Sequence, residues 1–213
     1  MADAFLTKET IKWDDLIADY VLMPITLAIT LLTGQNRKRG DLLGKILKVL
    51  GSTTFTGTGN GVMSGQALKK STPVGNIVVE MLTATTFKVV LPDGDRLDDG
   101  ATGVAYSNDY IGFTITVGGV PFIAGDKFTI PITAGSGKYV LSLAAAVDGS
   151  QNPESILAED KDATAEDKAT VAYIKGTFNQ NRIAFGTGHT AASTKDGLQA
   201  KDIILQTSVK AYA

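Results

Sequence analysis

The stretch NIVVEMLTATTFKVVLPDGDRLDDG, residues 76–100, followed by YIGFTITV, residues 110–117, decides the fold class. TATTFKVV and GFTITV alternate apolar with polar residues, which is the pattern of a strand with one buried face. PDGDRLDDG supplies the Asp and Gly residues that are typical of turns. DKFTIPIT, residues 126–133, continues the pattern. We therefore expect a small antiparallel β unit over residues 72–133.

Glycine-rich segments flank this unit on both sides. STTFTGTGNGVMSG, within residues 51–71, is interpreted as a linker or long loop, and AGSG closes the unit. Predicted strands outside it include VLMPITLAITLL, LLGKILKVL, KYVLSL, ESIL and KATVAYIKGTF. WDDLIA favours a short helical turn, and STKDGLQAKDIIL a short helix capped by Ser193 or Thr194. The predicted fold is mainly β with short helices (α+β).

Composition narrows the possible partners and compartments. The 213 residues are 44% hydrophobic and 20% charged, which is typical of a folded domain. No cysteine is present, so disulfides and thiolate sites are excluded. The net charge of −2 argues against nucleic acid as a partner. The apolar run over residues 20–32 is too short to span a membrane, so we expect synthesis in a cytoplasm and no membrane partner.

Candidate chemical sites are few, and each has a simpler structural interpretation. His189 is the only histidine and is interpreted as a loop residue. The Asp-rich turn at 93–99 fails the EF-hand pattern, and we interpret it as a β-turn while leaving a weak ion site open. RKRG, residues 37–40, is interpreted as a solvated hairpin tip, and AEDKDATAEDK as a solvated loop. We expect no catalytic residue, no metal and no cofactor.

Two separated blocks resemble the lambda-type head decoration proteins of tailed bacteriophages. The first, DDLIADYVLMPITLAITLLTGQNRKRGDLLGKI, covers residues 14–46. It is similar to that family in its proline near the first strand and in a G-x-x-x-x-R-G-x-x-L-G-K pattern. The matching residues are Gly34, Arg39, Gly40, Leu43, Gly44 and Lys45.

The second block covers residues 137–186 and resembles the same family in three places. They are DGSQ at Asp148–Gln151, ILAEDKDA at Ile156–Ala163 and VAYIKGTFN at Val171–Asn179. The two blocks cover about half of the chain, and their order and spacing carry the resemblance. The resemblance implies a structural virion protein on the outer surface of the capsid, frequent trimers, and an N-terminal arm that orders against the major capsid protein.

On this resemblance we predict three parts of the chain. Residues 1–20 form the capsid-binding arm, residues 21–51 and 137–213 form the decoration-protein core, and residues 52–136 form an inserted β-rich subdomain that departs from the smallest family members. The predicted capsid contacts are Phe5, Ile11, Trp13, Leu16 and Ile17. The predicted subunit contacts of a homotrimer are Leu22, Ile25, Leu27 and Ile29. The function expected is to bind and cement the expanded shell by bridging major capsid protein subunits.

Two other functions remain as alternatives. A carbohydrate-binding or adhesin module would use Tyr106, Tyr110 and Phe113 as an aromatic platform. An enzyme would need Asp93, Asp95 and Asp98 to act together, and the sequence provides no group that would orient them.

Overall fold

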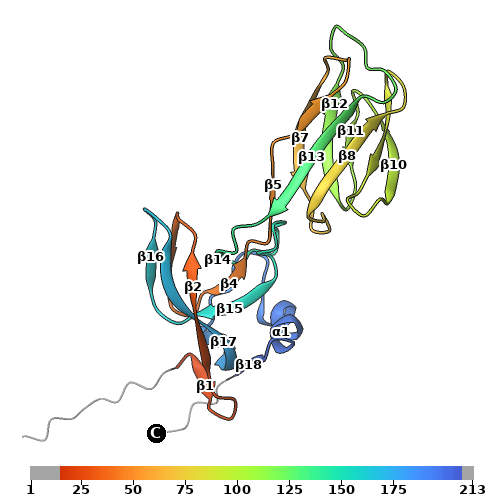
Figure 1. Cartoon of the computed structure of the whole chain (residues 1–213). Helices are drawn as coiled ribbons and strands as arrows, with labels where there is room; N and C mark the ends of the chain where they lie inside the picture. Colours follow the sequence, from red (N-terminus) through yellow and green to blue (C-terminus); the bar gives the residue numbers. More distant parts are fainter. Residues whose placement is uncertain (1–14, 208–213) are drawn as a thin grey trace, which may run out of the picture.

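In the computed structural model of the protein, the structure is described for residues 15–207. Within these residues it contains eighteen strands, one α-helix and one short 3₁₀ helix, so the predicted mainly β fold is confirmed. Figure 1 shows two groups of strands, one from the two ends of the described chain and one from its middle. Between residues 15 and 207, no helix has the length and apolar character needed to cross a membrane.

The first group closes on itself as a small ring. β2 pairs with β17, β17 with β15, β15 with β4, β4 with β14, and β14 with β2. β1 and β18 both pair with β17, and β3 pairs with β16 as a separate ribbon. The strands are β1 (Ile17–Asp19), β2 (Ile25–Leu31), β3 (Gln35–Arg37), β4 (Leu42–Lys45), β14 (Tyr139–Leu141), β15 (Pro153–Leu157), β16 (Lys161–Ala163), β17 (Lys168–Asn179) and β18 (Ile203–Gln206).

This ring buries side chains on both of its faces, because successive strand residues point to opposite sides. Leu42 belongs to one hydrophobic cluster, which we call the outer cluster, and the adjacent Leu43 belongs to a second one, which we call the inner cluster. Ile156 and Leu157 divide in the same way. Helix α1 (Ala191–Gln199) covers the outer cluster through Leu198, and the 3₁₀ helix η1 (Gln180–Arg182) follows β17.

The helix begins earlier than the sequence suggested. Its N-cap is Thr190, whose hydroxyl accepts from the N–H of Ser193 at 3.1 Å, and Ser193 Oγ accepts from the N–H of Thr190 at 2.9 Å. The prediction of Ser193 or Thr194 as the cap is therefore wrong. Ser193 completes a reciprocal cap as the third helical residue, a role that usually falls to Glu or Gln.

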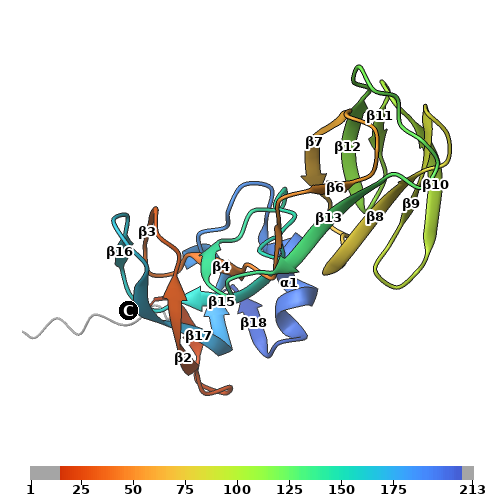
Figure 2. The ribbon, with the colours of Figure 1, turned by 45° about the horizontal axis from the view of Figure 1, so that its top comes forward.

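The second group is a sandwich of two sheets, which lie face to face in Figure 2. The larger sheet has β5 (Lys48–Leu50), β6 (Thr54–Thr56), β8 (Gly75–Met81), β9 (Thr86–Val90), β10 (Arg96–Ala101) and β13 (Lys127–Ala134). The smaller sheet has β7 (Val62–Leu68), β11 (Ala105–Ser107) and β12 (Ile111–Thr116). A separate hydrophobic cluster lies between them, with Phe87, Ile115 and Ile130 fully buried. The predicted strands at residues 76–100, 110–117 and 126–133 thus provide most of this cluster.

Two local predictions are wrong. The segment interpreted as a linker or loop contains β6 and β7. Its glycines permit close contact: a Cβ on Gly61 would lie 2.3 Å from the ring of the buried Phe122. The helical turn expected over residues 13–18 is replaced by β1 from Ile17, while Trp13 lies outside the described residues.

Candidate capsid and subunit contact surface

The predicted arm residues divide between the described and the undescribed parts of the chain. Phe5, Ile11 and Trp13 lie outside the described residues. Leu16 is 2% exposed and belongs to the outer cluster of the ring, and Ile17 packs against the same cluster. The structure therefore places Leu16 and Ile17 in the core and not on an arm.

The reason for this correction is the pairing of β1 with β17. Ile17 lies opposite Phe178, and the N–H of Asn179 donates to the carbonyl of Leu16 at 2.8 Å. Burial of the leucine side chain in an apolar cluster also stabilises this position. The part of the chain available as an arm accordingly ends before Leu16.

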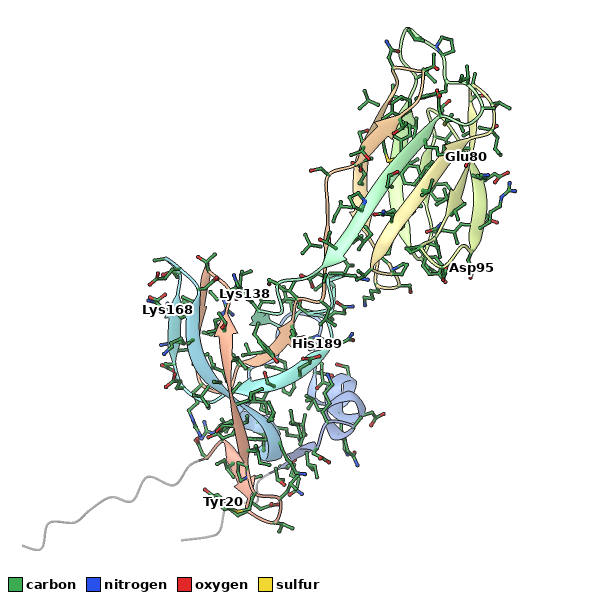
Figure 3. All side chains as sticks on the ribbon, viewed as in Figure 1. Tyr20, Glu80, Asp95, Lys138, Lys168 and His189 are labelled. Carbon is green, nitrogen blue, oxygen red and sulfur yellow. The ribbon has the colours of Figure 1, made fainter. Side chains whose placement is uncertain are left out.

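After β1 the chain exposes a run of apolar side chains, which we name the apolar ridge. Its members are Tyr20, Val21, Met23, Ile25 and Leu27. Val21 is 95% exposed, and Leu27 is 48% exposed although it lies in a paired strand. Residues 20–32 contain no charged side chain. Figure 3 places Tyr20 at the end of the ring remote from the sandwich.

The predicted subunit contacts fall partly on this ridge. Ile25 and Leu27 are exposed, and Leu22 is half-buried. Ile29 is 5% exposed inside the ring, so the structure does not leave it free for a subunit contact. All three strand residues share one face of β2, but the inner cluster covers that face only from Ile29 onward.

The two sequence blocks meet at a close backbone contact. A Cβ on Gly44 would lie 1.9 Å from the carbonyl oxygen of Ser150, which belongs to the DGSQ turn. The same carbonyl accepts from the buried hydroxyl of Ser142 at 2.7 Å. The carbonyl of Asp148 accepts from the N–H groups of Leu47 and Lys48 at 2.8 and 3.0 Å. The two motifs therefore form one packed joint.

The basic and acidic segments, which were both interpreted as solvated, meet each other while the charged ends of Lys38 and Asp160 stay exposed. Lys38 Nζ lies 2.9 Å from Asp160 Oδ2, and the N–H of Arg39 donates to Asp160 Oδ1 at 2.8 Å. Arg39 Nε donates to the carbonyl of Ala158 at 3.1 Å. The Arg39 N–H and the Lys38 ammonium lower the pKa of Asp160. The pairing of β3 with β16 brings these opposite charges together.

The family described as bacteriophage lambda head decoration protein D matches residues 25–203, which include both motif blocks and the joint between them. The chain belongs to this family. Membership of this family implies a structural protein of the phage head, located on the capsid exterior. In this decoration protein the sandwich lies between the two blocks of the family sequence.

Other comparisons add little to the family match. No curated protein matches this decoration protein. Two crystal structures of FlgL from Xanthomonas campestris, in space groups H3 and C2, match with TM-scores of 0.32 and 0.31 and identities of 20% and 22%. They cover 49% and 46% of this chain, which spans only 34% and 33% of the FlgL chains.

In this decoration protein, His189 and the Asp-rich turn, which were considered as candidate chemical sites, make hydrogen bonds to neighbouring residues of the fold. His189 Nε2 lies 3.1 Å from the hydroxyl of the buried Ser142, and burial lowers the pKa of His189. Asp93 accepts from the N–H of Asp95 at 3.0 Å within its own turn. Among residues 15–207, no group of three acidic or histidine side chains could hold a metal ion.

The aromatic residues of the adhesin hypothesis lie in the sandwich core. Phe113 is 3% exposed, and Tyr106 stacks on it with ring centroids 5.0 Å apart. Tyr106 and Tyr110 both pack against the buried cluster. These rings do not form an exposed platform, so the carbohydrate-binding hypothesis loses its support.

Sequence reasoning missed several residues of the candidate surface. The sequence places Tyr20 in the arm, and Val21 and Met23 are not among the individually predicted subunit contacts, although all three side chains are exposed. The one signal that could have found them is the absence of charge over residues 20–32. Lys48 was also missed, because an alternating strand gives no sign that a lysine in it is buried.

Proposed function

We propose that this chain binds the exterior of the expanded phage capsid and cements the shell by bridging major capsid protein subunits. Capsid contact is made by the segment that precedes β1, through Phe5, Ile11 and Trp13. The subunits associate as trimers through the apolar ridge. Membership of the decoration protein family supports the location on the capsid exterior. The exposed, uncharged ridge is the observation that supports the proposed contact between subunits.

Burial of the ridge would be favourable because it costs no charge desolvation. Exposed apolar side chains scattered over a surface are ordinary, but a contiguous run of them usually marks an interface. An exposed apolar run of this kind is also a hazard in a free monomer, since it invites non-specific association. A self-complementary contact between copies would remove it from water.

The capsid contact is tested by a chain that begins at Asp15, which removes the segment and keeps β1. We expect this protein to fold, as judged by circular dichroism, and to lose binding to expanded phage heads in a sedimentation assay. Trp13→Ala in the full chain should weaken binding in the same assay. Undiminished binding by the shortened protein would reject the arm as the capsid contact.

The subunit contact is tested by Leu27→Asp, which places a charge in the ridge. We expect light scattering to show a monomer for this variant and a trimer for the wild type. Val104→Asp is the matched control, because Val104 is an exposed valine of the sandwich that lies outside the ridge. Equal oligomeric states in all three proteins would reject the ridge as the subunit contact.

A further inference from the structure

The chain enters and leaves the sandwich along one ladder of paired backbone. Its steps are Tyr139 with Lys45, Lys138 with Ile46, Gly135 with Leu47, and Ala134 with Lys48. The N–H of Gly135 donates to the carbonyl of Leu47 at 2.8 Å. The ladder continues from β4 and β14 of the ring into β5 and β13 of the larger sheet. The two connections are therefore paired with each other, unlike a pair of free linkers.

Gly135 allows the two backbones of the ladder to approach each other closely. A Cβ on Gly135 would lie 2.5 Å from the carbonyl oxygen of Ile46, which is closer than any side chain can approach. A glycine in a strand often marks such a site of close backbone approach. The AGSG sequence thus permits the strands to touch.

Lys48 lies in the ladder and has a buried side chain, with 7% of its surface exposed. Its ammonium donates to the carbonyl oxygens of Lys69, Lys70 and Thr72, at 2.9, 2.8 and 2.8 Å. These three acceptors belong to the turn between β7 and β8 at the base of the sandwich. An ammonium has three donors, and here each has an acceptor.

The turn that receives Lys48 is itself closed by hydrogen bonds. The hydroxyl of Thr72 accepts from the N–H of Lys69 at 2.7 Å and also contacts the carbonyl of Tyr110, in the loop between β11 and β12. Thr72 is buried. The side chain of Lys48 is therefore connected to two loops at the base of the sandwich.

The backbone of Lys48 is bonded to the ring as well as to the neighbouring strand β13 of the sandwich. Its N–H donates to the carbonyl of Asp148 in the DGSQ turn at 3.0 Å, and Ala134 is its partner across the ladder. Lys48 is thus bonded to the DGSQ turn of the ring, to its partner strand in the ladder and to the turn at residues 69–72 of the sandwich.

We propose that Lys48 is a latch that holds the sandwich in one orientation relative to the ring. Bending of the sandwich relative to the ring would draw the turn at residues 69–72 away from the Lys48 ammonium, because the backbone N–H of Lys48 is bonded to Asp148 of the ring. The ammonium would then lose its acceptors while still partly enclosed, and a buried charge without partners is strongly disfavoured. The sandwich consequently moves with the ring as one body.

The first test is Lys48→Met, which keeps the length of the side chain and removes all three donors. We expect trypsin to cleave after Lys69 or Lys70 at least about tenfold faster than in the wild type, because local opening controls such cleavage. Mass spectrometry identifies the cleaved bonds. Lys195→Met is the matched control, since Lys195 is an exposed lysine in α1 and loses the same charge. Equal cleavage rates in the three proteins would overturn the proposal.

The second test keeps the proposal decidable if Lys48→Met fails to fold. The chain has no cysteine, so Ala84→Cys in the sandwich and Gln199→Cys in α1 give unique positions for two spin labels. We expect one narrow distance distribution by pulsed electron paramagnetic resonance, and a broader one when Lys48→Gln is added. A broad distribution with Lys48 intact, or equal widths with and without Lys48→Gln, would overturn the latch.

Discussion

Gly44 is the residue at which the two family blocks touch, and the structure predicts the cost of changing it. The carbonyl oxygen of Ser150 lies where a Cβ would be, at 1.9 Å, so Gly44→Ala must push β4 and the DGSQ turn apart. Overpacking of this kind costs roughly 1–3 kcal/mol or more. We expect a lower free energy of unfolding in urea.

Gly197→Ala is the control for this change. A Cβ on Gly197 would meet no atom within 4 Å beyond its chain neighbours and the backbone of its own helix, α1. Alanine should stabilise the helix there by about 0.5–1 kcal/mol. Substitution by alanine is thus expected to lower the free energy of unfolding at Gly44 and to raise it at Gly197. A neutral Gly44→Ala would show that the joint is looser than the structure indicates.

Single residues of the candidate surface were only partly predictable. Ile25 and Leu27 are exposed, but sequence alternation cannot show where along β2 the ring begins to cover one face. Ile29 has the same residue type and the same face, yet it lies in the inner cluster. Leu16 likewise depends on β17, which is far away in the sequence. The chemistry of a side chain alone does not specify its distant neighbours.

The loops at one end of the sandwich depend on a single carboxylate. Asp126 accepts from the N–H groups of Thr58, Gly59 and Ile123, at 2.9, 3.0 and 3.1 Å. The hydrogen bond from Thr58 contributes most to lowering the pKa of Asp126. Because the folded pKa lies below the ordinary value, the stability from ionised Asp126 is present above that value and is lost as pH falls through the folded pKa.

This linkage makes a prediction for the loop that contains Thr58 and Gly59. The amide resonances of both residues should titrate with a midpoint below 3.8, the ordinary Asp value. The melting temperature should fall through the same pH range. Asp126→Asn should lower the melting temperature at pH 7 and reduce its dependence on pH in that range. A midpoint at or above 3.8 would contradict the assigned hydrogen bonds.

At the scale of elements, the clearly alternating segments were predicted correctly, whereas LLGKILKVL, predicted as one strand, divides into β4 and β5, and the glycine-rich segment was misinterpreted. TATTFKVV and GFTITV give β9 and β12, since a period of two specifies a half-buried strand. The Gly/Thr-rich segment was interpreted as a loop although it forms β7. Glycine content alone does not distinguish flexible chain from backbone in close contact, as the contacts of Gly59 and Gly61 with Phe122 show.

At the scale of the molecule, the closed ring could not be predicted from local patterns. β2 pairs with β17 over seven residue pairs that are separated by more than half of the chain. β14 joins β2 through the single pair Tyr139 and Leu31. Such contacts depend on the whole arrangement of strands. The family resemblance nevertheless identified the two blocks that form the ring, because their order and spacing are retained.

The independence of the ring and the sandwich is a prediction that the hydrophobic clusters support. Both clusters of the ring consist of residues outside 49–133, and the cluster of the sandwich lies entirely within that range. Lys48 and Ala134 are paired, so the ends of that segment are adjacent. We expect residues 49–133 to be replaceable by Asn-Gly, a two-residue turn suited to antiparallel strands.

The shortened protein should show one cooperative thermal transition by circular dichroism, because its clusters and its closed ring are complete. It should also sediment with expanded heads as the full chain does, since the proposed capsid segment and the apolar ridge are both retained. A protein that fails to fold would show that the ring depends on the sandwich. A folded protein that no longer binds heads would instead place a capsid contact in the sandwich, and the arm would not be sufficient for decoration.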